Sequence, residues 1–439
     1  MHAHVYFQLC LRRYKFRIGV LIVFFDLCLF NSPVRSQGID GQTHSERKIS
    51  LEDALTIALE RNPQFHAIRD QVDAALGALR QSKLYPNPVL EFLAEEMPTH
   101  EMGLNQSQNL VAVKQPIITG GKRGIGIKLN EKSKEKNEFE RDAVLLNVVA
   151  DTKKAFYKVV ADQESFAIAQ KVEKIAKNIY QSEKVRFKGG EIPITNVLRA
   201  EVELSKARNS VSNAEGNLQN SLKELQTVMG SPEESIVGVT GKLLPNSGTI
   251  SLDELELKMA NNQPSLKASK KNIEIADTQV VFEERQAMPD INVSAGYKRL
   301  SQENLDTVQF GIEVPAPLFN RNQGNIQKSR AFSRKAKNDY QAVYNDLLFQ
   351  LRRDVTLYNV EQKRILEYRD KILPGADKSL KLIEKGYKEG EFGYLDLLDA
   401  QRTWAETRIS YIESLKNLNL LISDIERLAV VKIGDSNGK

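Results

Sequence analysis

Cysteine is almost absent from this 439-residue chain, since Cys10 and Cys28 are the two cysteines and both lie in the first 36 residues. Residues 37–439 therefore hold no disulfide, no thiolate nucleophile and no thiolate metal site. Histidine is scarce there too, and His44, His66 and His100 are too scattered in the sequence for a zinc site. The glycines at 120–124 lack the spacing and the Lys-Ser/Thr ending of a phosphate loop. The sequence thus predicts a protein that is not an enzyme, with no cofactor and no metal site.

Long apolar runs and clustered positive charge are also lacking. Beyond residue 36 no apolar run approaches the roughly 18 residues of a membrane-spanning helix. The formal net charge is +5, but residues 1–36 carry +4 of it, which leaves about +1 on the rest of the chain. A nucleic-acid partner requires clustered positive charge, so none is expected.

The first 36 residues have the pattern of a secretory signal peptide. A basic stretch at Arg12–Arg17 precedes the mostly apolar stretch Ile18–Phe30, which at 13 residues is short for a membrane anchor. A small-x-small cleavage site ends at Ser36. We expect residues 1–36 to be removed and residues 37–48 to form a flexible lead-in. A retained anchor and a lipid attached to Cys28 are the alternatives.

The chain carries one pattern twice, about 201 residues apart. Ile49–Asp53 returns as Ile250–Glu254, and further pairs are Asn62-Pro63 with Gln263-Pro264, Pro88 with Pro289, Pro116 with Pro317, and Tyr157 with Tyr358. The offset slips by one at Lys188–Ile192, which returns as Lys388–Phe392. This predicts two structural repeats, at 49–229 and 250–430. The glycine- and proline-rich stretch 230–249 links them, and residues 431–439 form a C-terminal tail.

Each copy predicts the same order of elements, which is a helix, a β-hairpin, a long helix and a second long helix. The first helix covers about 35 residues, at 51–84 and again at 252–286. A seven-residue spacing marks the return helices, with Val197, Leu204, Val211, Leu218 and Leu225 in the first copy and Leu397, Trp404, Tyr411, Leu418 and Ile425 in the second. Residues 121–187 lack proline, and 67 helical residues span about 100 Å. This length predicts a coiled-coil rod or tube, because a globular core cannot cover it.

The extended stretches predict two hairpins, with strands at about 88–96 and 108–116, and at about 290–298 and 307–315. Apolar and polar residues alternate in the second hairpin over about nine residues, the length of a tilted membrane strand. The predicted lipid-facing row is Ile291, Val293, Ala295, Tyr297, Val308, Phe310, Ile312 and Val314. An ordinary half-buried sheet is the alternative. Four strands cannot close a barrel, and three protomers would supply 12.

Two local motifs and the duplicated order of elements carry a resemblance to a known family. The motifs are Pro315–Gly324 (PAPLFNRNQG) and Tyr387–Gly390 (YKEG), which leads into Leu395–Ala400 (LDLLDA). Over residues 49–430 the chain resembles the TolC-like outer membrane factor family, and most of all its heavy-metal branch of cobalt–zinc–cadmium and copper–silver exporters. The resemblance implies a mainly α homotrimer, with a 12-stranded transmembrane β-barrel in the outer membrane and an α-helical tunnel across the periplasm.

The resemblance also implies partners and a function. The inner end of the tunnel would dock with a periplasmic adaptor that links it to an inner-membrane pump, proton-driven and of the RND type. The chain would be the export duct of this tripartite system, passing heavy-metal cations. The same channel for drugs or for type I protein secretion is one alternative. A periplasmic coiled-coil scaffold is the other, although it has no use for a lipid-facing row.

Two aspartates of the second return helix are the candidate gate. Asp396 and Asp399 lie three apart on one helical face and match aspartates that close the tunnel entrance in the family. Three protomers would form two carboxylate rings that attract cations. The alternative is helix capping by Asp396. The first copy has Asn196 and Arg199 at these positions, so the charge is not a folding requirement that the two copies share. The tip residues predicted to contact the adaptor are Gly189, Gly190, Glu191, Pro193, Gly390, Glu391 and Gly393.

Overall fold

The computed structural model describes residues 47–97, 99, 103–233, 236–245, 248 and 250–433, within a compact unit of Ser45–Lys439. The predicted signal peptide, residues 37–46 of the lead-in and the tail beyond residue 433 lie outside the described residues. Residues 47 and 48 of the predicted flexible lead-in belong to a short strand instead.

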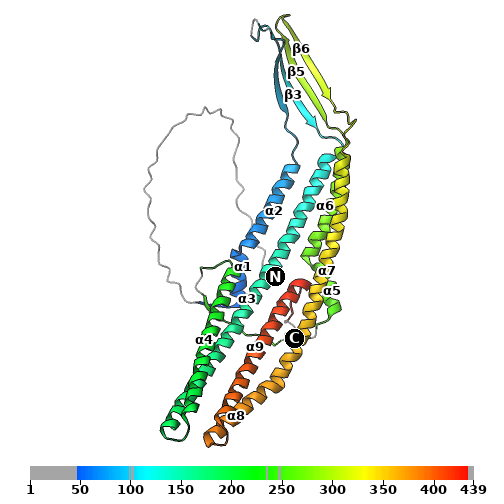
Figure 1. The fold of residues 1–439 in the computed structure, drawn as a ribbon. Helices are drawn as coiled ribbons and strands as arrows, with labels where there is room; N and C mark the ends of the chain where they lie inside the picture. Colours follow the sequence, from blue (N-terminus) through cyan, green and yellow to red (C-terminus); the bar gives the residue numbers. More distant parts are fainter. Residues whose placement is uncertain are drawn as a thin grey trace, which may run out of the picture. The chain divides into compact units, whose positions relative to one another are not determined.

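The two copies fold with the same order of elements (Figure 1). The first copy comprises α1 (Leu51–Arg61), α2 (Pro63–Ser82), β2 (Val89–Glu95), β3 (Gln108–Ile117), α3 (Lys122–Lys188) and α4 (Ile194–Val228). The second comprises α5 (Leu252–Asn262), α6 (Pro264–Gln286), β5 (Ile291–Leu300), β6 (Leu305–Glu313), α7 (Gln323–Glu367), a π-helix (Tyr368–Ile372), α8 (Leu373–Glu389) and α9 (Tyr394–Ala429). The predicted mainly helical, duplicated fold is therefore confirmed.

The first helix of each copy is broken in two, which the sequence analysis did not predict. Asn62 and Gln263 adopt extended backbone angles, and Pro63 and Pro264 each begin the next helix, where a missing N–H costs nothing. Each break holds the end of a return helix. The Asn62 side-chain amide donates to the carbonyl of Val228 at 2.7 Å, and that of Gln263 donates to the carbonyls of Arg427 and Leu428, both at 3.1 Å.

The four strands of the two hairpins form a single antiparallel sheet in the order β2-β3-β5-β6. The copies therefore join within the sheet, where β3 pairs with β5. Residues that pair across neighbouring strands share a face, and one face carries two apolar lines. They run Phe92–Val111–Tyr297–Val308 and Leu90–Val113–Ala295–Phe310. Among the described residues, the outer edges of β2 and β6 pair with no other strand.

The main core lies in the middle of the helical unit, where α1, α3, α4, α5, α7 and α9 and a small parallel sheet contribute buried apolar side chains. That sheet pairs β1 (Arg47–Ile49) with β4 (Ile236–Val239), in the stretch predicted as a linker. Ile49, Leu225, Met259 and Tyr358 are almost fully buried there. The sequence analysis missed this sheet because its strands are three and four residues long.

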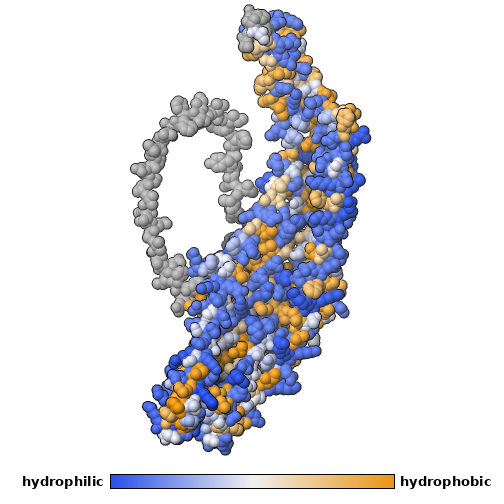
Figure 2. All heavy atoms as spheres, viewed as in Figure 1, coloured by the Kyte–Doolittle hydropathy of each residue, from blue (hydrophilic) through white to orange (hydrophobic). Residues whose placement is uncertain are grey.

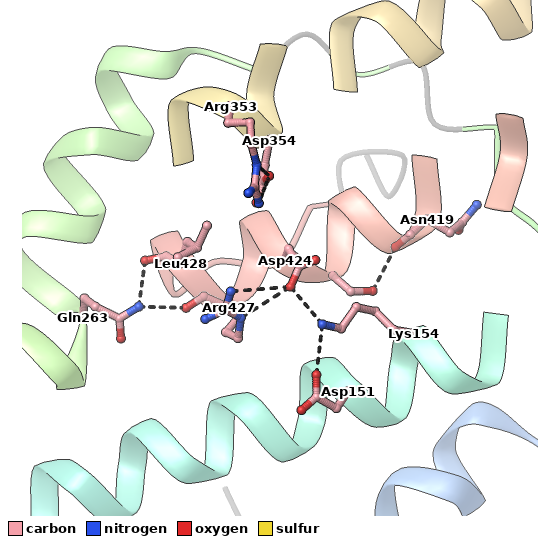
Figure 3. Close-up of polar contacts among 10 residues, drawn as sticks. Asp151, Lys154, Gln263, Arg353, Asp354, Asn419, Asp424, Arg427 and Leu428 are labelled. Atoms are coloured by element: carbon pink, nitrogen blue, oxygen red, sulfur yellow. Dashed lines mark hydrogen bonds and ion pairs between the residues drawn. The ribbon is translucent and has the colours of Figure 1, made fainter. Parts of the chain in front are cut away.

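A layer of charged side chains flanks this core between α3, α7 and α9 (Figure 3). Lys154 lies between Asp151 at 2.9 Å and Asp424 at 3.2 Å. Asp354 of α7 is 2% exposed; one carboxylate oxygen contacts Arg353, and the other is buried without a hydrogen-bond partner in the structure. Burial raises the pKa of the Asp354 carboxyl, although Arg353 opposes the shift.

Elsewhere the helices are largely polar on their outside, as Figure 2 shows for one face. In the part of the chain that the structure describes, no helix is both long enough and apolar enough to cross a membrane.

Candidate functional site

Two tight turns lie at the end of the helices opposite the sheet (Figure 1). The α3–α4 turn is Gly189–Pro193, and the α8–α9 turn is Gly390–Gly393. Gly190 and Gly390 have φ values of 78° and 81°, a region that favours glycine. Pro193 and Gly393 are the N-caps of the helices that follow. The structure thus brings the predicted tip residues to one end of the molecule.

The two predicted gate aspartates have different local partners. The Asp396 carboxylate accepts the backbone N–H of Gly393 at 2.9 Å, as in a capping box. Asp399 is exposed and forms an ion pair with Arg402 at 2.8 Å, one turn further on. Asp396 therefore has the capping role that was the alternative to a gate role, whereas Asp399 takes no part in capping. Among the described residues, no group of three or more His, Cys, Asp or Glu side chains is placed to hold a metal ion.

A buried polar contact joins the two helical hairpins near these turns. The hydroxyl of Tyr387 on α8 donates to Glu183 on α3, whose side chain is fully buried. Arg186 donates to the Tyr387 hydroxyl at 3.3 Å and binds Glu191 of the α3–α4 turn at 3.2 Å. The second oxygen of Glu183 is buried without a hydrogen-bond partner in the structure. Sequence reasoning missed this contact, although Tyr387 stands in one of the motifs that it used.

The environment of these groups keeps the tyrosines neutral. Burial, followed by the carboxylate of Glu183, raises the pKa of Tyr387 to about 12. Burial also raises the pKa of Tyr394, whose hydroxyl is buried without a hydrogen-bond partner in the structure. The side chain of Glu191 raises the pKa of Arg186. Tyr387 is therefore a hydrogen-bond donor across the physiological pH range.

A second cluster holds the α8–α9 hairpin together further from the turns. The indole N–H of Trp404, the one tryptophan in the sequence, donates to Asp377 at 2.6 Å, and Arg408 binds both oxygens of Asp377 at 2.9 Å. The cations of Lys171 on α3 and Arg408 on α9 lie 4.5 Å and 4.9 Å from the centre of the indole ring. The heptad spacing identified Trp404 as a seam residue but gave no sign of its charged neighbours.

The exposed face of the sheet contains the predicted lipid-facing residues. Val308, Phe310 and Ile312 are 68%, 79% and 76% exposed. Val293, Ala295 and Tyr297 are exposed too, while Ile291 is half-buried. Val314 is exposed but lies just after the end of β6. The opposite face is polar and holds the ion pairs Glu91–Lys114, at 3.1 Å, and Glu95–Lys298, at 3.4 Å.

Comparison with known proteins identifies relatives along most of the chain. Residues 54–231 and 258–419 match the family described as Outer membrane efflux protein. The cobalt-zinc-cadmium resistance protein CzcC of Cupriavidus metallidurans is 28% identical over 382 residues, which cover 87% of this chain and 90% of CzcC. TolC of Vibrio cholerae is 21% identical over 88% of this chain and 93% of TolC. The crystal structure of the Campylobacter jejuni CmeC outer membrane channel aligns with a TM-score of 0.75 at 15% identity, over 86% of this chain and 85% of CmeC.

Together with these relatives, a sheet with one apolar face at one end of long, polar helices defines an export channel of the outer membrane. The chain belongs to the outer membrane efflux protein family, and the match covers parts of both copies. The predicted family and the predicted location in the outer membrane are confirmed. The similarity to CzcC confirms the predicted resemblance to the heavy-metal branch. The family consists of channel proteins rather than enzymes.

Proposed function

We propose that this protein is the outer-membrane export duct of a tripartite efflux system and that its cargo is heavy-metal cations. The observation that carries the proposal is the sheet β2-β3-β5-β6, with its exposed apolar face and two edges that pair with no other strand in the described part of the chain. Unpaired edges cannot face lipid, because each free N–H and C=O costs several kcal/mol there. Three copies joined edge to edge would form a 12-stranded barrel and bring their helices together as a tunnel.

The two turns would contact a periplasmic adaptor, and through it a proton-driven RND-type pump. The glycines at 189, 190, 390 and 393, together with Glu191, Pro193 and Glu391, lie at the end that would face such a partner. Tight exposed turns on rigid helices are common docking surfaces.

Asp399 and Asp396 would form the carboxylate rings of the gate in a trimer. Asp399 supports this role more strongly, because both side chains are exposed but that of Asp399 is not used in capping. In planar bilayers, replacing both aspartates by asparagine should raise the resting conductance and weaken block by multivalent cations. Glu406→Gln, which removes an exposed carboxylate two turns further along α9, is the matched control. Unchanged conductance and block in the double variant would contradict the gate.

Growth assays test the cargo. A strain that lacks the gene would be titrated with zinc, cobalt, cadmium, copper and silver, and in parallel with lipophilic drugs. We expect sensitivity to metals alone, restored by the gene, because CzcC is a cobalt-zinc-cadmium resistance protein and shares 28% identity with this chain. Sensitivity to drugs alone would contradict the proposed metal cargo but would still be consistent with the proposed export duct. A protein that needs no detergent to stay in solution would contradict the duct itself.

A further inference from the structure

Three exposed cations lie at places where helices meet strands. Lys83 lies between α2 and β2, Arg285 near the end of α6, and Arg321 between β6 and α7. All three side chains are exposed, and in the described part of the chain none forms an ion pair with a carboxylate. Of the nearby carboxylates, Glu284 and Asp290 are bound to other cations, Arg330 and Lys122, each at 2.8 Å, and Glu283 accepts hydrogen bonds from the amides of Gln279 and Asn322.

Direct contacts show that these junctions lie together. Arg123, at the start of α3, donates to the backbone carbonyl of Lys83 at 2.6 Å, and its guanidinium lies 3.9 Å from the centre of the Tyr85 ring. Gly120 packs so closely against Met288 that an added Cβ would lie 2.9 Å from its sulfur. Asn322 binds the side chain of Glu283 at 2.7 Å, which places the β6–α7 junction beside α6.

Large apolar side chains lie near these cations in the sequence and are exposed to solvent. Phe319 is 92% exposed, Tyr85 74%, Leu318 68% and Leu84 57%. Leu318 and Phe319 belong to the PAPLFNRNQG motif, which neither the gate nor the tunnel explains. They follow directly on the exposed apolar face of the sheet, through Ile312 and Val314. Figure 2 shows hydrophobic and hydrophilic surface side by side along the strands.

We propose that this junction collar, defined as Lys83, Leu84, Tyr85, Arg123, Arg285, Leu318, Phe319 and Arg321, binds anionic phospholipid in the leaflet on the helix side of the membrane. Aromatic and apolar side chains beside cations are the pattern of a membrane interface, where rings lie at headgroup level and cations reach the phosphates. The inference rests on the proposed placement of the sheet in the membrane and adds the lipid class. Excess positive charge favours an anionic headgroup over a zwitterionic one.

Lipid titration of the detergent-solubilised full-length protein, followed by native mass spectrometry, tests the headgroup. We expect tighter binding of dioleoyl-phosphatidylglycerol than of dioleoyl-phosphatidylethanolamine. The triple variant Lys83→Gln/Arg285→Gln/Arg321→Gln should lose this preference by roughly fivefold per removed charge. The matched control replaces three exposed lysines far from the junctions, Lys223→Gln/Lys363→Gln/Lys378→Gln, and should keep the preference.

Three results would overturn the proposal: equal binding of the two lipids, an unchanged preference in the triple variant, or full competition by free glycerol phosphate, which would indicate a simple anion site. Equal binding leaves the proposed duct intact. A protein that binds neither lipid would contradict the duct as well.

Placement of the collar is tested separately with a nitroxide attached to Phe319→Cys in reconstituted vesicles, with the labelled wild type as the blank. Contact with lipid predicts faster relaxation by oxygen than by a water-soluble nickel chelate. A label that neither reagent reaches would mean that a second copy covers Phe319, and this would overturn the proposal, as would a label that the chelate reaches better.

Discussion

Asp396 and Asp399 lie three residues apart in the sequence, yet their side chains make different contacts. Asp396 satisfies the backbone N–H of Gly393 at the start of α9, whereas Asp399 contacts one exposed arginine. An N-terminal carboxylate contributes about 0.3–1 kcal/mol to a helix, while an exposed ion pair within a helix contributes about 0–0.5 kcal/mol.

Asp396→Asn should therefore lower the free energy of unfolding by about 0.5–1 kcal/mol, and Asp399→Asn should leave it unchanged within about 0.5 kcal/mol. Thermal unfolding of the two single variants measures the difference. A larger loss in Asp399→Asn would show that the ion pair with Arg402 is structural, which would weaken the case for Asp399 as a gate residue.

Asp354 predicts a pH dependence of stability. Its pKa is raised in the folded protein by burial, so protonation favours the folded state. This stabilisation is complete below the ordinary aspartate pKa of about 3.9 and is lost as the pH rises through the folded pKa. Arg353, Asp424 and Arg427 also act on this carboxyl.

Asp354→Asn should raise the free energy of unfolding at pH 7 by about 1 kcal/mol, because it removes the cost of a buried charge. It should also flatten the gain in stability that we expect the wild type to show on mild acidification. Chemical unfolding at pH 5 and pH 7 measures both effects. Asp346→Asn, on the exposed side of α7, should behave as the wild type. Lower stability of Asp354→Asn at pH 7 would contradict the assignment.

At the scale of elements, proline placement decides where the first helices break. The apolar pattern continues across Asn62 and Gln263, so periodicity predicts one long helix in each copy. Pro63 and Pro264 nevertheless disfavour helical angles at the residue before them, and tertiary contacts then hold each break, since the side chains of Asn62 and Gln263 bind the end of a distant return helix. Those partners lie 166 and 164 residues away, beyond the reach of a local sequence pattern.

Gly230 allows a test of how rigid the chain is at the break between α1 and α2. It has a φ of 74°, and an added Cβ would lie 2.4 Å from the carbonyl oxygen of Arg61. Gly230→Ala should lower the free energy of unfolding by about 1–3 kcal/mol. The control is Gly216→Ala in the middle of α4, where nothing lies within 4 Å. That change should be neutral or stabilise by up to about 1 kcal/mol, because alanine favours helix. Equal effects would mean that the Gly230 turn can adjust.

At the scale of the whole molecule, the repeat and the alternation of polarity were enough to predict the two copies, the hairpins and the long helices. These predictions were possible because the spacing of apolar residues, every second residue in the strands and every seventh in the helices, can be read from residues close together in the sequence. The contact between Glu183 and Tyr387 could not be predicted in this way. This contact depends on how the α3–α4 and α8–α9 hairpins pack against each other. In the sequence, each of the two residues looks like any other polar residue of a helix.

Assembly through the sheet predicts covalent cross-links between copies. Cysteine pairs that combine position 90 or 92 on β2 with position 308, 310 or 312 on β6 scan the register of the joint. Oxidation of at least one pair should give a closed covalent trimer on denaturing gels. The pair Val293→Cys/Ile312→Cys, which faces across β5 and β6 of one protomer, should leave the size of the chain unchanged. Dimers without trimers, from every pair, would contradict a three-membered ring.

The even number of strands in the sheet decides the direction in which the copies of an assembly point. The strands β2 and β6 run in opposite directions, because three antiparallel pairings separate them. Antiparallel joining of β6 to β2 of the next copy is therefore head-to-tail, and every copy then points its helices to the same side. Pairing of β6 with another β6 would invert one copy and send its helices to the opposite side. The parity of the sheet thus makes the assembly polar, with one entrance and one exit.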